Sequence, residues 1–370
     1  MEQRQIVQLW RRGGARVLVT LVQVEGSSYR RPGARLLLAD DGSYTGTISG
    51  GCLEAEVIRR ASWTVRDGAV VKRYSTAFDD TSDVPFGLGC GGTVDLLLEP
   101  ADAPEGKALL QCMERTLAGE SFKVVTWLPG EGRGLCRIVL DEAGAIVFAS
   151  EGLSQKKIEC SQGLVPGEHY AGRFVEQLRP AQRLMIFGAG DDAKPLAAMA
   201  SLMGWTVIVV DGRSQLATVA RFPSADRVLV ASDAGVVTQL GITTNDAVAV
   251  MSHSYEQDRS LLTALLPLQP KYLGLLGAKH RSSLLVSEAS QASGLSIAEC
   301  CNRLWAPIGF DLGGDGPEAI ALAIMAEIQA VCANKVGTSR RLLPEDVARH
   351  LGEGFSREQP ESQCALDTAS

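Results

Sequence analysis

The sequence lacks long apolar runs, a basic excess and C-x-x-C motifs. No apolar segment approaches the ~20 residues that cross a bilayer, and residues 1–14, MEQRQIVQLWRRGG, lack the apolar core of a signal peptide. We therefore expect no membrane partner and a cytoplasmic location. The formal net charge of -7 argues against nucleic acid as a partner, because binding to a phosphate backbone needs a basic face.

The cysteines form no C-x-x-C motif, so a zinc ribbon is not indicated. Their number, nine, is odd, and they are spread over a long chain, which favours reduced thiols. We expect most of them to be small buried side chains. The nine are Cys52, Cys90, Cys112, Cys136, Cys160, Cys300, Cys301, Cys332 and Cys364.

Length and composition predict a two-domain globular protein. The chain has 370 residues, of which 45% are hydrophobic and 21% charged, and a chain of this length usually exceeds one hydrophobic core. The segment LRPAQ, residues 178–182, is the best candidate for the boundary. We therefore expect domains at 1–180, with a core at 12–100, and at 181–334, followed by a polar, mobile tail at 335–370.

The first half mixes strands and helices. Residues 16–25 are rich in Val, Leu and Thr and predict a strand, while 34–40 and 43–49 flank Asp41-Gly42 as in a β-hairpin. From residue 52 the apolar positions follow helical spacing, with acids in the first turn, where the helix dipole favours them. A helix near 107–117 and three further strands, FKVVTWL, LCRIVLD and AIVFAS, are expected before the boundary.

The second half alternates apolar strands with amphipathic helices, which is typical of a doubly wound parallel sheet. A last helix is expected to start at Pro317. We therefore predict an α/β protein with an N-terminal α+β domain and a Rossmann-like C-terminal domain. The expected strands are RLMIFG, TVIVVD, RVLV, AVAVMS and YLGLLG, at residues 183–188, 206–211, 227–230, 247–252 and 272–277.

A glycine motif between the first two of these strands indicates a dinucleotide fold. Gly188 would allow the tight turn, Gly190 the approach of a pyrophosphate, and Ala193 close packing of helix on sheet. Asp211 ends the next strand, where an acid grips a ribose hydroxyl. The two aspartates at 191–192 would repel a phosphate at the helix start, so a Rossmann fold that binds no dinucleotide is an equal alternative.

Three loops at the expected carboxyl ends of the later strands could contact a ligand. His253 follows AVAVMS, and Lys279 and Arg281 follow YLGLLG, forming a basic cluster at a helix start that suits an anion. The third loop spans residues 306–318 and is rich in glycine and aspartate. A single histidine is more often structural than catalytic, so the convergence of the loops is the stronger signal.

Two thiols lie in glycine-rich turns of the first domain. Cys52 follows Gly50-Gly51 at a helix start, where free N–H groups lower a thiol pKa and can also cradle a phosphate. Cys90, in GLGCGGT, has glycines on both sides that leave its sulfur approachable. Together with Arg30 and Arg31 they predict a pocket for an anionic, sulfur-seeking ligand, although each thiol alone could be a packing choice.

These motifs resemble one family. The segments GSSYRRPGARLLLADDGSYTGTISGGCLEAEV and GLGCGGTVDLLLEP are similar to the first domain of the XdhC/CoxI family, accessory factors of xanthine dehydrogenase and related molybdenum hydroxylases. FGAGDDAKPLAAMASLMGW, MSHSYEQD, YLGLLGAKHR and APIGFDLGGDGPEAIALAIMAEI are similar to its Rossmann domain. The resemblance covers residues 16–331. Ser49 replaces a glycine that is common in the family before Gly50.

The resemblance implies a chaperone that holds the molybdenum cofactor (molybdopterin), supports its sulfuration by a cysteine desulfurase and delivers it to an apo-hydroxylase. Cys52 would then contact molybdenum or its sulfur, with Cys90 beside it, and the arginines would hold the pterin phosphate. A carrier of this kind does little bond-making itself. An NAD(P)-dependent oxidoreductase and a redox-sensing thiol protein are the alternatives. We expect a homo-oligomer, with the ligand lying between the two domains.

Overall fold

The computed structural model describes residues 2–51, 53–75, 92–130 and 132–337 of the chain. Cys52, Cys90 and nearly all of the expected tail lie outside these ranges. In the part of the chain that is described, no helix is long and apolar enough to cross a membrane.

The N-terminal part begins with a five-stranded antiparallel sheet in the order β3-β2-β1-β5-β4. Helix α2 packs on one face of this sheet through a buried apolar cluster, and α1 packs on the other. The bounds are α1 Glu2–Arg12, β1 Ala15–Glu25, β2 Arg35–Ala39, β3 Tyr44–Gly46, α2 Glu54–Thr64, β4 Val70–Ser75 and β5 Thr93–Pro100.

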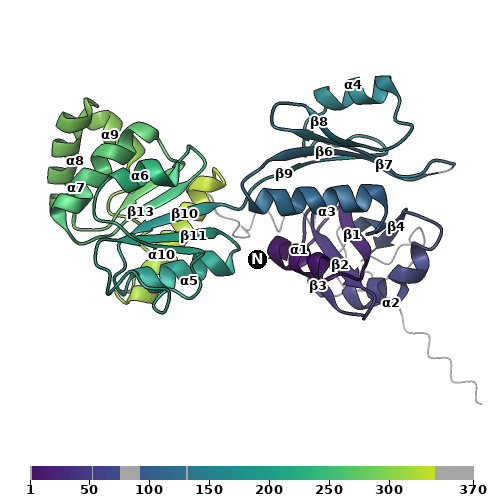
Figure 1. The fold of residues 1–370 in the computed structure, drawn as a ribbon, viewed down its shortest axis with the longest axis horizontal. Coiled ribbons are helices and arrows are strands. Elements are labelled where there is room, and N and C mark those ends of the chain that lie inside the picture. Colours follow the sequence, from purple (N-terminus) through teal and green to yellow (C-terminus); the bar gives the residue numbers. More distant parts are fainter. Residues whose placement is uncertain (1, 52, 76–91, 131, 338–370) are drawn as a thin grey trace, which may run out of the picture.

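A second, four-stranded antiparallel sheet follows, in the order β8-β7-β6-β9. Helix α3 lies between the two sheets (Figure 1), and the buried ion pair of Arg137 with Glu99, at 2.9 Å, joins β7 to β5. Helix α4 covers the outer face. The bounds are α3 Pro104–Leu117, β6 Phe122–Trp127, β7 Cys136–Asp141, β8 Ile146–Ala149, α4 Gln155–Gly163 and β9 Arg173–Leu178.

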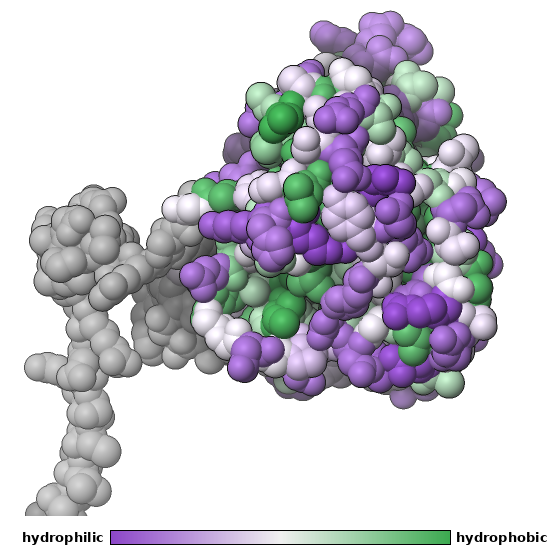
Figure 2. All heavy atoms as spheres, turned by 90° about the vertical axis from the view of Figure 1, so that its left-hand side faces the viewer, coloured by the Kyte–Doolittle hydropathy of each residue, from purple (hydrophilic) through white to green (hydrophobic). Residues whose placement is uncertain are grey.

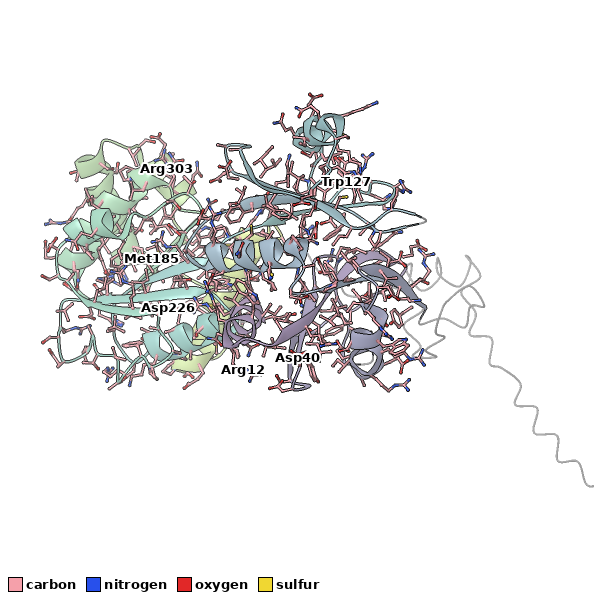
Figure 3. The ribbon with its side chains drawn as sticks, turned by 45° about the vertical axis from the view of Figure 1, so that its right-hand side comes forward. Arg12, Asp40, Trp127, Met185, Asp226 and Arg303 are labelled. Atoms are coloured by element: carbon pink, nitrogen blue, oxygen red, sulfur yellow. The ribbon has the colours of Figure 1, made fainter. Side chains whose placement is uncertain are left out.

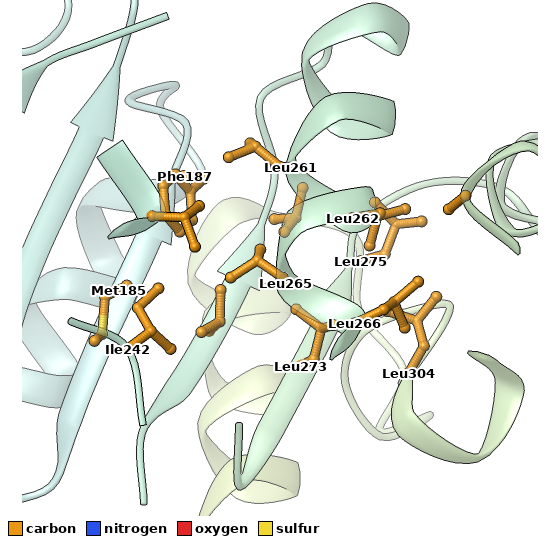
Figure 4. Close-up of a cluster of buried hydrophobic side chains, with 14 of the residues drawn as sticks. Met185, Phe187, Ile242, Leu261, Leu262, Leu265, Leu266, Leu273, Leu275 and Leu304 are labelled. Atoms are coloured by element: carbon orange, nitrogen blue, oxygen red, sulfur yellow. The ribbon is translucent and has the colours of Figure 1, made fainter. Parts of the chain in front are cut away.

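The C-terminal part is a parallel five-stranded sheet in the order β12-β11-β10-β13-β14, with helices on both faces. Figure 4 shows the apolar cluster beneath α7, with Leu261, Leu262 and Leu265 against Phe187. The bounds are β10 Arg183–Phe187, α5 Ala193–Leu202, β11 Thr206–Asp211, β12 Arg227–Val230, α6 Gly235–Leu240, β13 Ala247–Val250, α7 Tyr255–Leu265, η1 Leu266–Leu268, β14 Tyr272–Leu275, α8 Lys279–Ser293, α9 Ile297–Arg303 and α10 Pro317–Cys332.

The predicted fold class is confirmed: an α+β part precedes a Rossmann-like parallel sheet. All five expected parallel strands form, and the last helix starts at Pro317 as predicted. Among the described elements, those not predicted from the sequence are α1, β4, α4, β9, η1 and α9.

Helix α1 joins the two parts of the molecule. Arg4 donates to the carboxylate of Asp226 at 2.6 Å and to the hydroxyl of Thr206 at 3.0 Å. Thr206 is the first residue of β11, and Asp226 immediately precedes β12 (Figure 3). The N-terminal part therefore contacts the edge of the Rossmann sheet at which these parallel strands begin.

Candidate functional site

A buried carboxylate shapes the loop that precedes the α2 helix. Glu54 is 5% exposed and accepts from the backbone N–H of Ile48 at 3.0 Å, from that of Ser49 at 2.8 Å, and from the Ser49 hydroxyl. Ser49 Oγ in turn accepts from the N–H of Gly51 at 3.2 Å and of Leu53 at 3.1 Å. One serine and one glutamate thus fix the backbone on both sides of position 52.

The Glu54 carboxylate is held in its charged form. Burial acts to raise the pKa of Glu54, but the hydrogen bonds from Ser49 and the backbone N–H groups outweigh burial, and the net pKa is lowered. The sequence analysis explained the acids in the first turn of this helix by their favourable interaction with the helix dipole. Its main role is as an acceptor for the loop, and the five-residue separation of Ser49 from Glu54 is the signal that could have indicated it.

Two further segments lie beside this loop. A Cβ on Gly50 would be 3.5 Å from Cγ of Tyr29, so the tyrosine ring lies against this glycine, although Tyr29 as a whole is 81% exposed. A Cβ on Gly92 would be 2.0 Å from the carbonyl oxygen of Ser27. The 26–33 loop is therefore in contact with Gly50 and with Gly92, the residues that lie two positions from Cys52 and Cys90 in the sequence.

The two predicted arginines differ in what they contact. Arg30 pairs with Glu2 of α1 at 2.6 Å, and the same carboxylate accepts from the N–H of Thr47 at 2.9 Å. Arg31 is exposed, and its guanidinium has no hydrogen-bond or ion-pair partner among the described residues. Arg31 is thus the arginine of this loop that is free to bind an anion, while Arg30 fixes the loop against α1.

The predicted thiols themselves fall outside the described residues, so their roles remain predictions. Gly51 has φ +106° and nothing within 4 Å of a Cβ placed on it, which leaves the backbone before Cys52 open on that side. Within the described ranges no group of three or more His, Cys, Asp or Glu side chains could hold a metal ion.

The glycine turn after β10 has the predicted geometry for a Rossmann sheet. Gly188 has φ +128°, and a Cβ there would be 2.2 Å from the carbonyl oxygen of Met251, so only glycine fits. Gly190 is different, because a Cβ there would meet only the ring of His253, at 3.7 Å. The turn is thus closed at Gly188 and has room at Gly190.

The Asp211 carboxylate is buried and bonded within the chain. One oxygen accepts from the N–H of Ala189 at 2.7 Å, and both accept from the guanidinium of Arg213 at 2.7–2.9 Å. Burial acts to raise the pKa of Asp211, but these bonds outweigh burial and lower it. The sequence analysis did not identify Arg213, whose half-exposed guanidinium pairs with the Asp211 carboxylate. A contact between Asp211 and a ribose stays a prediction.

The aspartates at the start of α5 are partly neutralised. Asp191 pairs with Lys194 at 2.7 Å and with Arg221 at 3.0 Å, and both cations lower its pKa. Asp192 lies 3.7 Å from His253. The repulsion expected for an incoming phosphate is therefore offset at Asp191. A shallow pocket of about 460 Å³ opens beside Lys194 and Arg221.

The segments that follow β13 and β14 are joined by the buried carboxylate of Asp258 on α7. Asp258 is fully buried, pairs with Arg281 at 2.7 Å and accepts from the Ser252 hydroxyl at 2.5 Å. Between them His253 has φ +61° and a half-exposed side chain. Arg281 is therefore committed to Asp258, whereas Lys279 is exposed at the helix start.

Within one chain, the described structure does not bring the predicted ligand loops of the Rossmann sheet next to the 26–54 region of the first part. Glycines 188 and 190, His253 and Arg281 follow the carboxyl ends of their strands, whereas α1 contacts the amino ends. Strands of four to six residues separate these edges by roughly 13–20 Å. Figure 2 views the molecule from the Rossmann side, where polar groups alternate with small apolar ones.

Comparison with known proteins links this site to a family. The description "XdhC and CoxI family" matches residues 9–75, and "XdhC Rossmann domain" matches residues 184–328, together more than half of the chain. The first range contains the 26–33 loop and the Ser49–Glu54 contacts, and the second contains the glycine turn.

Individual relatives extend the match along most of the chain. A Bacillus subtilis (strain 168) protein described as a probable xanthine dehydrogenase subunit is 28% identical over 84% of this chain and 92% of its own. The Escherichia coli (strain K12) protein "Molybdenum cofactor insertion chaperone PaoD" is 25% identical over 86% of this chain and 84% of its own.

A solved structure has the same fold. The crystal structure of a xanthine dehydrogenase from Bacillus halodurans superposes with a TM-score of 0.78, at 28% identity, over 94% of this chain and 99% of that one. The match covers both the antiparallel part and the Rossmann part. On the two family models and these full-length similarities, the chain belongs to the XdhC and CoxI family.

Proposed function

We propose that this chain is a molybdenum-cofactor chaperone, which binds the cofactor, supports its sulfuration with a cysteine desulfurase and delivers it to a xanthine dehydrogenase-type hydroxylase. The names of the two relatives support the cofactor and the recipient. The observation that carries the proposal is the Ser49–Glu54 contact, which fixes the backbone around position 52 beside a free arginine and an exposed tyrosine ring.

The residues of this loop suit the parts of such a cargo. Arg31 supplies an unpaired guanidinium for the pterin phosphate, Tyr29 supplies a flat apolar surface for a ring, and Gly51 leaves space beside the backbone. Cys52 would supply the sulfur ligand. NAD(P) is the weaker candidate ligand, because Arg213 and the Ala189 N–H already occupy the Asp211 carboxylate.

We extend the proposal to the assembly. In one chain the strand-end loops of the Rossmann sheet lie on the edge away from α1, so they cannot enclose the same ligand as the 26–54 region. A second copy of the chain could supply them. The expected homo-oligomer would then be needed to complete the site rather than only to stabilise it.

The proposal is tested on the protein purified from a host that makes molybdenum cofactor. Oxidative extraction should release fluorescent pterin, and elemental analysis should find molybdenum in a similar molar amount. A preparation with neither, from a host whose hydroxylases are active, would contradict cofactor carriage and favour the oxidoreductase or thiol-sensor alternatives.

A further inference from the structure

A pocket of about 720 Å³ lies in the four-stranded sheet, and all of its lining residues except Val71 fall between the two matched family ranges. It opens at the ends of β6, β7 and β9 and reaches Val71 of β4. Its volume is within the range of small-molecule sites. The lining residues are Val71, Trp127, Leu128, Pro129, Gly130, Arg133, Gly134, Cys136, Lys157, Ala171, Gly172 and Arg173.

The strand register places an aromatic ring and a cation side by side in this pocket. Trp127 is paired with Cys136 of β7 on one side and with Arg173 of β9 on the other. Directly opposed residues of antiparallel strands point to the same face, so these three side chains form a row. Trp127 lies below α4 (Figure 3), and Lys157 of that helix is 5.4 Å from the centre of its ring.

A third cation comes from the turn between β6 and β7. Arg133 and Gly130 are joined by two backbone hydrogen bonds, of 3.1 and 2.9 Å. A Cβ on Gly130 would be 4.0 Å from Nη2 of Arg133, so the guanidinium folds back over the turn. Among the described residues, the side chains of Arg133, Lys157 and Arg173 have no ion-pair partner. The described residues that line the pocket include no aspartate or glutamate.

These three cations have no counter-charge among the described residues, so they repel one another, and a bound anion would reduce that repulsion. An indole face beside them stacks well with a planar heteroaromatic ring. The apolar groups Val71, Leu128 and Pro129 complete a wall for such a ring. We propose that this pocket binds a small aromatic phosphate, a planar heteroaromatic ring that carries a phosphate group, such as a nucleotide or a phosphorylated pterin.

The site is independent of the cofactor-carrying loop. Apart from Val71, its residues belong to a module that lies between the two matched ranges, and none of them lies in the 26–54 region. The probes below contain no molybdenum. Failure of this proposal therefore leaves the chaperone proposal standing, and the reverse also holds.

The test is isothermal titration of the full-length protein with guanosine 5′-monophosphate, neopterin monophosphate and inorganic phosphate. One or both ring-bearing phosphates should bind with a Kd below about 1 mM, and inorganic phosphate should bind at least about tenfold more weakly because it cannot stack. Which ring binds better distinguishes a nucleotide site from a pterin site.

Matched variants locate the binding. Lys157→Gln and Arg173→Gln should each weaken binding by about tenfold, since each removes a charged contact. Lys156→Gln and Arg179→Gln make the same charge changes at exposed neighbouring positions and should leave it unchanged. The proposal would be overturned if neither ring-bearing phosphate showed saturable binding, or if inorganic phosphate bound equally well. It would also be overturned if binding were lost in Gly190→Val but kept in Lys157→Gln.

Discussion

At the residue scale, the central feature is the pair formed by Ser49 and Glu54. The hydroxyl of Ser49 donates to the carboxylate and accepts from two backbone N–H groups. The serine therefore restricts the backbone of this loop through specific hydrogen bonds. We infer that the loop before Cys52 is held in one conformation by side-chain contacts in this chain.

Replacing the carboxylate with an amide tests that inference. Glu54→Gln should lower the free energy of unfolding by about 1–3 kcal/mol, because an amide accepts less well from the N–H groups of Ile48 and Ser49. Urea unfolding measures it. The control is Glu56→Gln on the same helix, which loses ion pairs to Arg59 and Arg60 and should cost less than about 1 kcal/mol. Equal losses would mean that the loop does not depend on Glu54.

The same carboxylate predicts a pH dependence. Its pKa is lowered in the folded protein, so its stabilising effect is complete above the unfolded value of about 4.3 and is lost as the pH falls below it. The difference in stability between the parent and Glu54→Gln should be constant from neutral pH down to about pH 5 and should narrow below about pH 4. A difference that widens on acidification would show that another group dominates.

At the scale of elements, the turn from β10 into α5 contains one glycine with no room for a side chain, Gly188, and one with room for a Cβ, Gly190. Gly188→Ala should destabilise by more than about 2 kcal/mol, because the Cβ would meet the Met251 carbonyl at a positive φ. Gly190→Ala should fold within about 0.5 kcal/mol of the parent, and Gly190→Val should fold but lose any nucleotide-like ligand of this turn. Thermal unfolding and calorimetry check both, and a Gly188→Ala protein as stable as the parent would contradict the assignment.

The hydrophobic pattern was enough to predict β10, β11, β13 and β14, because their apolar residues are buried and follow one another without interruption. Strand β9 was missed because its sequence, RFVEQL, places charged and amide groups among the apolar ones, including the Glu176 that pairs with buried Arg35. Such pairs depend on tertiary contacts. The roles of Glu54 and Arg213 were missed for another reason: their contacts are local, with Ser49 and Asp211 respectively, but hydrophobic pattern does not report hydrogen bonds between polar side chains.

At the scale of the whole molecule, the position of α1 determines which surfaces can face one ligand. Since Arg4 contacts the strand starts at Thr206 and Asp226, the expectation of a ligand enclosed by both domains requires a second chain. Residues 1–180 alone should then bind cofactor much more weakly than the intact protein, and adding residues 181–370 should restore part of the loss. Equal affinity of the fragment and the intact chain would contradict a shared site.

Mixed oligomers give a sharper form of this test. Cys52→Ala and Gly190→Val chains carry lesions in different halves, so a co-expressed mixture should contain assemblies with one intact composite site. These should retain cofactor when neither variant does so alone, as measured by pterin fluorescence per chain. If the mixture retains no more than the separate variants, each chain uses its own two halves, or the Rossmann half takes no part in binding.

The central claim is that the loop ending at Cys52 holds the cofactor, and one comparison tests it most directly. The pterin and molybdenum content of purified Cys52→Ala is measured against the parent, with Cys160→Ala, an exposed thiol on α4, as the control. The account predicts that Cys52→Ala folds but retains almost none, that Cys90→Ala retains more, and that Cys160→Ala matches the parent. A folded Cys52→Ala protein with parental cofactor content would contradict it.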